Sequence, residues 1–262
     1  HQDTLGPFIA SRKKEGLKSN TINRDLAVVR RVLMLAARLW RDDRGNPWLE
    51  TPPLIRMLDW KDARKPYPVS WVEQERLFAE LPKHMREMAL FKVNTGTREA
   101  EVCGLRWEWE VSLPELSSSV FLIPGDLVKN GEDRLVVLNS VAKAVVNRQR
   151  GKHLEYVFTY QYKGEYKPVE RMNTKAWRRA RDVTGLSPVR VHDLKHTFGR
   201  RLRAAGIGVE TRMVLLGHTN KQITTHYSAV EIAELIEAAE KVSFERGSTP
   251  TLTLLKSSNA MT

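Results

Sequence analysis

Apolar residues recur at steps of three and four along the stretch from Thr21 to Trp40. Because residues with this spacing share one side of an α-helix, the pattern predicts a helix with a single buried stripe. The stripe contains Ile22, Leu26, Val29, Leu33, Ala36 and Trp40. We therefore predict a helical domain at residues 1–62.

Residues 59–70 end this pattern with the sequence DWKDARKPYPVS, which combines charged residues with two prolines. Ser70 and Glu73 then have the spacing of a helix capping box, in front of the run WVEQERLFAEL. The sequence therefore predicts a linker at 63–69 and a new domain that begins at residue 70.

The new domain is predicted to be mainly α-helical, with a small antiparallel β-sheet near its middle. The segments SVFLIP and RLVVL have strand-like composition, and Asn130-Gly131 between them is a turn signal. Helical patterns occupy 84–94, 98–106, 140–150, 171–183, 192–205, 209–217 and 228–242. The domain is expected to span 70–242, and the polar residues 243–262 are expected to form a mobile tail.

The predicted helix at 228–242 carries an apolar stripe of its own. One face holds Ile232, Leu235, Ile236 and Ala239, and glutamates occupy other positions. An apolar stripe needs a surface to cover it, which can belong to the same chain or to a neighbouring one.

The net charge of the chain indicates the class of molecule that it binds. The chain has 43 Lys and Arg residues against 31 Asp and Glu, for a formal net charge of +12. A cationic surplus of this size favours polyanions, and nucleic acid is the leading candidate. Arg24, Arg31 and Arg38 recur every seven residues on the first predicted helix, so they lie along one side of it. They are candidate contacts for a phosphate backbone; the alternative is an ordinary solvated cationic face.

Cysteine usage and hydropathy indicate the cellular compartment of the protein. Cys103 is the only cysteine, which excludes an intramolecular disulfide and a cysteine-based zinc cluster, and it is expected to be a buried structural thiol. No apolar run approaches the roughly 18 residues of a membrane span, and no secretory signal opens the chain. These features predict a cytoplasmic protein without a membrane partner.

The stretch VHDLKHTFGRR places two histidines, His192 and His196, four residues apart on a predicted helix. This spacing is close to the zinc-protease pattern H-E-x-x-H. A zinc site needs a further ligand and favours nearby carboxylates, whereas this segment carries Lys195 and several arginines. The surrounding cations favour an anionic ligand, and we predict neither a metal nor another cofactor.

Four further motifs accompany this one along the chain. They are NTGTREAEVCGLRW with Arg98, Lys129 on the first strand of the predicted turn, LLGH ending at His218, and THYS with Tyr227. As an ordered set, they resemble the motifs of the tyrosine recombinase (phage integrase) family. Residues 1–62 also resemble the family's helical core-DNA-binding domain, so the resemblance covers essentially the whole chain.

The resemblance implies a set of catalytic residues: Arg98 as the first arginine, Lys129 as the β-hairpin lysine, His192 and Lys195 in the H-x-x-R box, His218 as the later histidine, and Tyr227 as the nucleophile. Lys195 departs from the pattern, because the family usually has its second arginine there. Glu101 lies one helical turn after Arg98 and is expected to orient its guanidinium. His196 is expected to support the helix.

The chemistry requires cations near a phosphate. Attack by a tyrosine oxygen on a phosphodiester passes through a five-coordinate phosphorus that carries additional negative charge, and preorganised cations stabilise it. Arg98, Lys195 and His218 are the candidates for this task.

Two protons must also move. A phenol has a pKa of about 10, so Tyr227 needs a base, and a neutral His192 is a reasonable one. The departing 5′-oxygen needs an acid, and Lys129 is the candidate. The product is a 3′-phosphotyrosyl bond that keeps the energy of the phosphodiester, so rejoining needs neither ATP nor metal.

The family resemblance implies double-stranded DNA with core recombination sites as the partner, and a tetramer on that DNA, because two strands of each of two duplexes must be exchanged. The helix at 228–242 is our candidate for docking onto a neighbouring protomer. Two alternatives remain: a type IB topoisomerase, which uses similar residues as a monomer, and a catalytically silent DNA-binding protein, which Lys195 makes conceivable. Residues 1–62 and the LLGH motif favour the recombinase over the topoisomerase.

Overall fold

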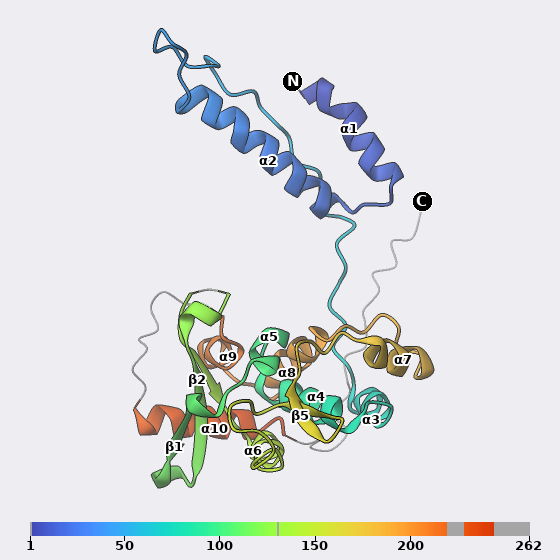
Figure 1. Cartoon of the computed structure of the whole chain (residues 1–262), viewed down its shortest axis with the longest axis vertical. Coiled ribbons are helices and arrows are strands. Elements are labelled where there is room, and N and C mark those ends of the chain that lie inside the picture. The colour runs from blue at the N-terminus through green and yellow to red at the C-terminus, as the bar shows by residue number, and fades with distance from the viewer. Residues whose placement is uncertain (1, 130, 219–227, 244–262) are drawn as a thin grey trace. The chain divides into compact units, whose positions relative to one another are not determined.

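The computed structural model describes residues 2–129, 131–218 and 228–243. It divides into two compact units, His1–Lys65 and Pro66–Thr262, and Figure 1 labels most of their helices and strands. The predicted nucleophile Tyr227 and the predicted tail beyond residue 243 lie outside the described residues.

The first unit contains two helices, α1 (Gln2–Lys14) and α2 (Ser19–Arg38). The predicted stripe on α2 is confirmed: Ile22 and Leu26 are fully buried and pack with Ile55 of the following segment. The stripe ends earlier than predicted, because α2 stops at Arg38 and Trp40 lies beyond it. Helix α1 was not predicted, since its sequence contains Gly and Pro and has only weak apolar periodicity.

The extended segment after α2 is tied back to that helix. The Asn23 side-chain amide donates to the Leu58 carbonyl at 2.9 Å, and the Leu58 amide donates to the Asn23 side-chain oxygen at 2.7 Å. A side-chain amide that satisfies both backbone groups of one residue acts like a rung of a β-ladder. This pair therefore orders a segment that has no regular secondary structure.

The second unit begins with α3 (Trp71–Ala79), whose predicted capping box is present. The Glu73 amide donates to the Ser70 hydroxyl at 3.2 Å, and the Ser70 amide donates to the Glu73 carboxylate at 2.8 Å. The remaining helices are α4 (Lys83–Thr95), α5 (Glu99–Cys103), α6 (Ser140–Asn147), α7 (Lys175–Val183), α8 (Asp193–Ala204), α9 (Val209–Leu216) and α10 (Ala229–Glu240). Helix α4 is central, because it contacts α3, α5, α6 and α8.

A three-stranded antiparallel sheet interrupts the helices. Its strands are β1 (Glu110–Leu113), β2 (Ser118–Ile123) and β3 (Arg134–Val137), in the order β1-β2-β3. The two predicted strands are therefore confirmed. The placement of Lys129 on a strand is wrong: it lies in the connection between β2 and β3, after the short 3-10 helix Gly125–Leu127.

Strand β1 and the separate hairpin of β4 (Thr159–Tyr162) and β5 (Glu165–Pro168) were not predicted. Each of these strands has four residues, and β5 is exposed throughout, so hydrophobic alternation gives little signal. These strands are stabilised by pairing with a neighbouring strand, and their own sequences carry no strand pattern.

Helix α10 packs on its own chain. Ile232, Leu235 and Ala239 are buried in a cluster that includes Leu135 and Val137 of β3, and Figure 1 shows α10 beside the sheet. At the helix end, Ser140 donates from its amide to the Glu240 carboxylate at 2.7 Å. The surface that covers these side chains therefore belongs to β3 and α9 of the same chain, and docking of this helix onto a neighbouring protomer stays a prediction.

Cys103 is the buried structural thiol that was predicted. Burial raises the pKa of its thiol to about 12, which leaves it protonated and unreactive at neutral pH. None of the helices in the described ranges has the length and apolarity of a membrane-crossing segment.

Candidate active site

Arg98 is positioned by a tight turn between α4 and α5. Helix α4 ends at Gly96, whose backbone is left-handed with φ of 65°. A Cβ atom there would lie 2.6 Å from the Phe198 ring, so glycine is needed for both the conformation and the close packing. The turn places Arg98 at the N-cap of α5.

The predicted contact between Arg98 and Glu101 is present. The Arg98 guanidinium donates to Glu101 Oε1 at 2.6 Å, and the Arg98 amide donates to Oε2 at 2.7 Å. Burial acts to raise the pKa of Glu101, but Arg134 and Arg98 outweigh it and hold the pKa below its ordinary value. Glu101 is therefore a charged, buried carboxylate that fixes the direction of the guanidinium.

Helix α8 carries the histidine-lysine motif. His192 is exposed at the helix N-cap, and its ring lies 4.9 Å from the ring of His196 in an edge-on arrangement. Partial desolvation and the charge of Lys92 lower the pKa of His192 to about 4. His192 is therefore neutral at pH 7 and able to accept a proton.

Lys195 lies one turn further along α8 and is buried, with only 4% of its surface exposed. Its ammonium donates to the backbone carbonyl of Leu216. Burial first, and then the charge of Arg134, lower the pKa of Lys195 to about 7. The charge of this lysine therefore titrates near neutral pH.

His218 follows directly after α9. The helix ends at Gly217, which is left-handed with φ of 57°, and the His218 amide donates back to the Met213 carbonyl at 2.9 Å. Burial, followed by the charges of Lys195 and Arg98, lowers the pKa of His218. The last turn of α9 thus delivers the His218 side chain to the same cationic region.

The C-terminal end of α9 is the point where these elements meet. The last three carbonyls of α9 and that of its C-cap Gly217 all accept from cationic side chains: Val214 and Leu215 from Arg134 at 2.8 and 2.7 Å, Leu216 from Lys195, and Gly217 from Arg98 at 3.3 Å. Carbonyls at a helix end have no partner within the helix, and they carry partial negative charge. One helix end therefore gathers cations from β3, α8 and α5.

Two buried cations in this region were missed from the sequence. Arg134 begins β3, where a strand-end arginine is usually a surface residue. Lys92 lies in α4, is fully buried, and donates from its ammonium to the Thr97 carbonyl just before Arg98. Burial lowers the pKa of Lys92 to about 8. The only sequence signal for a buried Lys92 is a charged residue at a helix position that is otherwise apolar.

The other predicted site residues fall outside this cluster or outside the described ranges. Lys129 is exposed in the β2–β3 connection, and Tyr227 is not among the described residues. On α2, the three arginines of the predicted stripe, Arg24, Arg31 and Arg38, are all exposed. Within the described ranges, no group of three His, Cys, Asp or Glu side chains is close enough to hold a metal ion.

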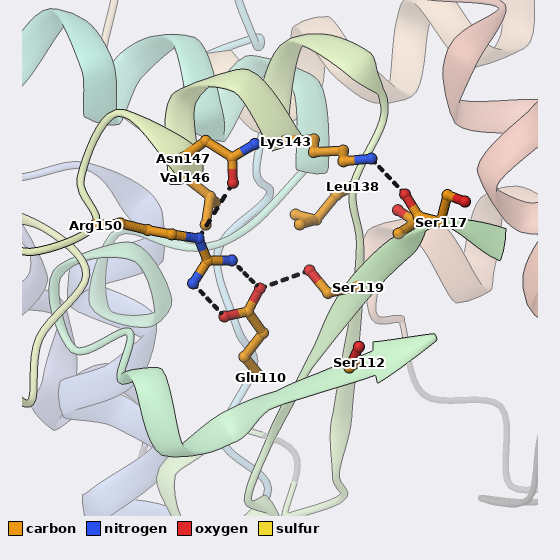
Figure 2. Close-up of a pocket in the computed structure, with 10 residues that line it drawn as sticks. Glu110, Ser112, Ser117, Ser119, Leu138, Lys143, Val146, Asn147 and Arg150 are labelled. Atoms are coloured by element: carbon orange, nitrogen blue, oxygen red, sulfur yellow. Dashed lines mark hydrogen bonds and ion pairs between the residues drawn. The ribbon is translucent and has the colours of Figure 1, made fainter. Parts of the chain in front are cut away.

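A polar pocket of about 400 Å³ lies between β1, β2 and α6, and Figure 2 shows its lining. Arg150 donates to both oxygens of Glu110 at 2.6 and 3.0 Å, and the Ser119 hydroxyl donates to the same carboxylate at 2.6 Å. Lys143 donates to the Ser117 carbonyl. The Glu110 and Arg150 charges are paired with each other, and this ion pair connects the edge strand β1 to the residues just after α6.

The second unit is thus a mainly helical domain that gathers arginine, lysine and histidine side chains at the end of α9. The model of the phage integrase family matches residues 72–234, and the chain belongs to this family.

Named relatives agree with this assignment. The integrase of Salmonella phage P22 is 26% identical over 230 residues, which are 83% of this chain and 56% of that protein. Tyrosine recombinase XerA of Thermococcus kodakarensis is 25% identical over 243 residues, which are 89% of this chain and 79% of that protein. The chain thus spans little more than half the length of the phage relative.

Solved structures share the fold. The Tn1549 transposon integrase in complex with circular intermediate DNA has a TM-score of 0.59 at 17% identity, covering 89% of this chain and 83% of that one. The XerH site-specific recombinase bound to palindromic difH substrate has a TM-score of 0.63 at 15% identity, covering 84% and 66%. The predicted fold class, mainly helical and tyrosine recombinase-like, is confirmed.

Proposed function

We propose that this protein is a site-specific DNA recombinase that cuts and rejoins DNA through a 3′-phosphotyrosyl bond at Tyr227, without ATP or metal. The observation that carries this proposal is the gathering of Arg98, Lys195 and His218 at the end of α9, within the domain that matches the phage integrase family. Named relatives include an integrase and tyrosine recombinases, which supports the same activity.

The cations stabilise the charge of the transition state. Arg98 keeps its direction through Glu101, so it presents donors to the phosphate without reorganising during the reaction. Lys195 and His218 add positive charge or donors from α8 and the end of α9. An ammonium lacks the two-pronged donor geometry of a guanidinium, so Lys195 holds one oxygen where an arginine holds two.

The proton transfers use the remaining residues. Neutral His192 takes the proton of the Tyr227 hydroxyl as the tyrosine oxygen forms its bond to phosphorus. The bond from phosphorus to the 5′-oxygen breaks, and Lys129 protonates that oxygen to give a free 5′-hydroxyl. Attack of a 5′-hydroxyl on the phosphotyrosine reverses these steps and joins the strands.

The partner is double-stranded DNA with core recombination sites, bound in the cytoplasm by a tetramer of this chain. The net charge of +12 supports a polyanionic partner. The Tn1549 integrase structure contains circular intermediate DNA and the XerH structure contains a palindromic difH substrate, which is in keeping with this assignment. Exchange of two strands in each of two duplexes requires four nucleophiles, and four protomers supply them.

We predict that Arg24, Arg31 and Arg38 contact backbone phosphates. Replacing Arg31 with Ala should weaken binding to all DNA sequences similarly and reduce the slope of log affinity against log salt by about one unit. Fluorescence anisotropy at several salt concentrations measures both quantities. Arg12→Gln is the control, because the Arg12 charge is already paired with Asp25 and Glu15. An Arg31→Ala slope equal to that of the parent returns the stripe to the solvated-face interpretation.

Covalent capture tests the proposed function. A binding selection on fragments of the source genome supplies a core site, and a nick in that site lets the cleaved strand diffuse away and traps the protein on DNA. We expect an adduct on a denaturing gel that forms equally well with EDTA present. Sequence-independent relaxation of supercoiled DNA by a monomer would favour the topoisomerase instead.

A silent DNA-binding protein is the second candidate, and one observation favours it. The Lys195 ammonium is occupied by the Leu216 carbonyl and its pKa is about 7, so part of the population lacks this charge at neutral pH. Specific binding without any adduct in the capture experiment would support this candidate.

A further inference from the structure

Arg134 is a buried arginine with no role in the proposed chemistry. It is 2% exposed, and its guanidinium donates to the carbonyls of Leu135 at 2.7 Å, Val214 at 2.8 Å and Leu215 at 2.7 Å, with a longer contact to Thr95 at 3.4 Å. A buried guanidinium is costly unless its donors are satisfied. Here the acceptors come from three different segments, so the guanidinium connects β3, the end of α9 and the end of α4.

Gly217 makes room for this guanidinium. A Cβ atom at position 217 would lie 2.4 Å from Arg134 Nε and 2.5 Å from its Cδ. The glycine of the LLGH motif therefore has two tasks. Its left-handed backbone ends α9, and its missing side chain leaves the space that the Arg134 side chain fills.

The carbonyls held by Arg134 are next in sequence to those that hold the catalytic cations. Arg134 binds the carbonyls of Val214 and Leu215, Lys195 binds that of Leu216, and Arg98 binds that of Gly217. A shift in the last turn of α9 moves all four carbonyls together. Because misplacement of catalytic groups by about 1 Å can cost about 100-fold in rate, the anchor of this turn matters for the chemistry.

Arg134 also sets the charge around Lys195. The titratable groups that face this lysine are Arg134 from β3, Glu101 and Arg98 from α5, Lys92 from α4, and His192 and His218. Among these charges, that of Arg134 acts most strongly to lower the pKa of Lys195, and Glu101 opposes it. Loss of the Arg134 charge therefore raises the pKa of Lys195.

We infer that Arg134 is a positioning residue for strand transfer: it anchors the last turn of α9 through the space left by Gly217, and so places Lys195, Arg98 and His218 around the phosphate. This inference rests on the proposed function. It assigns a positioning role to a buried β3 arginine that was not among the predicted site residues.

The first experiment compares Arg134→Met and Arg134→Lys with the parent in single-turnover adduct formation. Arg134→Met should slow the reaction about 100-fold. Its rate should also fall off at a higher pH than that of the parent, because the Lys195 ammonium persists further without a neighbouring cation. Arg134→Lys should recover part of the rate and keep the pH profile of the parent. An arginine that only stabilises the fold would lower the amount of folded protein, and the folded fraction of Arg134→Met would keep a rate within a few-fold of the parent.

Glycine variants keep the inference testable if Arg134→Met does not fold. Gly217→Ala keeps the arginine at position 134, but the new methyl group displaces its guanidinium from the end of α9. This variant should show a similar loss of rate. Gly206→Ala is the matched control, because Gly206 is also left-handed, with φ of 75°, but has open space around its missing side chain. The control should suffer the backbone strain of the substitution yet keep adduct formation within a few-fold of the parent.

Hydrogen exchange gives a readout that needs no activity. The amides of Gly217 and His218 are bonded to Val214 and Met213 in the last turn of α9, and they should exchange faster in Arg134→Met and Gly217→Ala than in Gly206→Ala. No adduct from the parent would refute the proposed function, while the exchange data still test the anchor. An active parent whose Arg134→Met variant matches it in rate, pH profile and exchange would overturn the inference.

Discussion

Replacing Tyr227 with Phe is expected to abolish the covalent protein-DNA adduct while DNA binding stays unchanged. The substitution removes only the phenolic oxygen, which is the atom that we propose forms the bond to phosphorus. Removing a covalent nucleophile typically costs about 10⁴-fold or more in rate, so the adduct should fall below detection. Denaturing electrophoresis with the nicked substrate measures the adduct, and anisotropy with the intact site measures binding.

Tyr162→Phe serves as the control for this experiment. Tyr162 is an exposed tyrosine on β4, and its loss of a hydroxyl should leave adduct formation within a few-fold of the parent. Undiminished adduct from Tyr227→Phe would show that another residue is the nucleophile. Loss of binding along with the adduct would instead mean that Tyr227 has a structural role.

Lys195 is expected to be required for cleavage and to make the rate sensitive to pH. Its ammonium is protonated below a pKa of about 7 in the free protein, so the positive charge at the site disappears as the pH rises through that value. At subsaturating DNA, the single-turnover rate reports the free protein and should fall above about pH 7. At saturating DNA, the bound phosphate favours the charged form, so the decline should move to higher pH.

Two variants of Lys195 distinguish the effect of its positive charge from that of its donor geometry. Lys195→Ala should be about 10²–10³-fold slower, because one oriented donor to the transition state and one bond to the end of α9 are lost. Lys195→Arg should remain active and lose the decline above pH 7, because a guanidinium stays protonated. Rates across a pH series for the three proteins measure both effects.

Two outcomes would change the assignment of Lys195. An Ala variant as fast as the parent would remove this lysine from the catalytic set. An inactive parent whose activity is restored by Arg would mean that the lysine disables the site, and the silent DNA-binding function would then be favoured.

Local patterns predicted those elements whose signals lie within a few residues. The α2 stripe, the Ser70 capping box and strands β2 and β3 follow from periodicity and capping chemistry, which need no distant partner. The contact between Arg98 and Glu101 was predictable for the same reason, because the two residues are three positions apart at the start of one helix.

Tertiary packing alone decided the elements and contacts that depend on distant residues. Strand β1 and the β4–β5 hairpin exist through pairing, and the surface that covers α10 belongs to β3 and α9 of the same chain. The turn before Arg98 also depends on packing, because Gly96 lies against Phe198, a residue about 100 positions away in the chain.

The sequence by itself determined the fold class, the family and the order of the chemical motifs, since each motif is a short local pattern. It did not reveal that Arg134, Lys195 and Arg98 share the carbonyls at the end of α9. These side chains come from three separate elements, and their pKa values depend on burial and on one another's charge. Only the folded chain brings these cations within reach of one helix end, because the electrostatic cost of crowding them is offset there by buried carbonyls and by the Glu101 carboxylate.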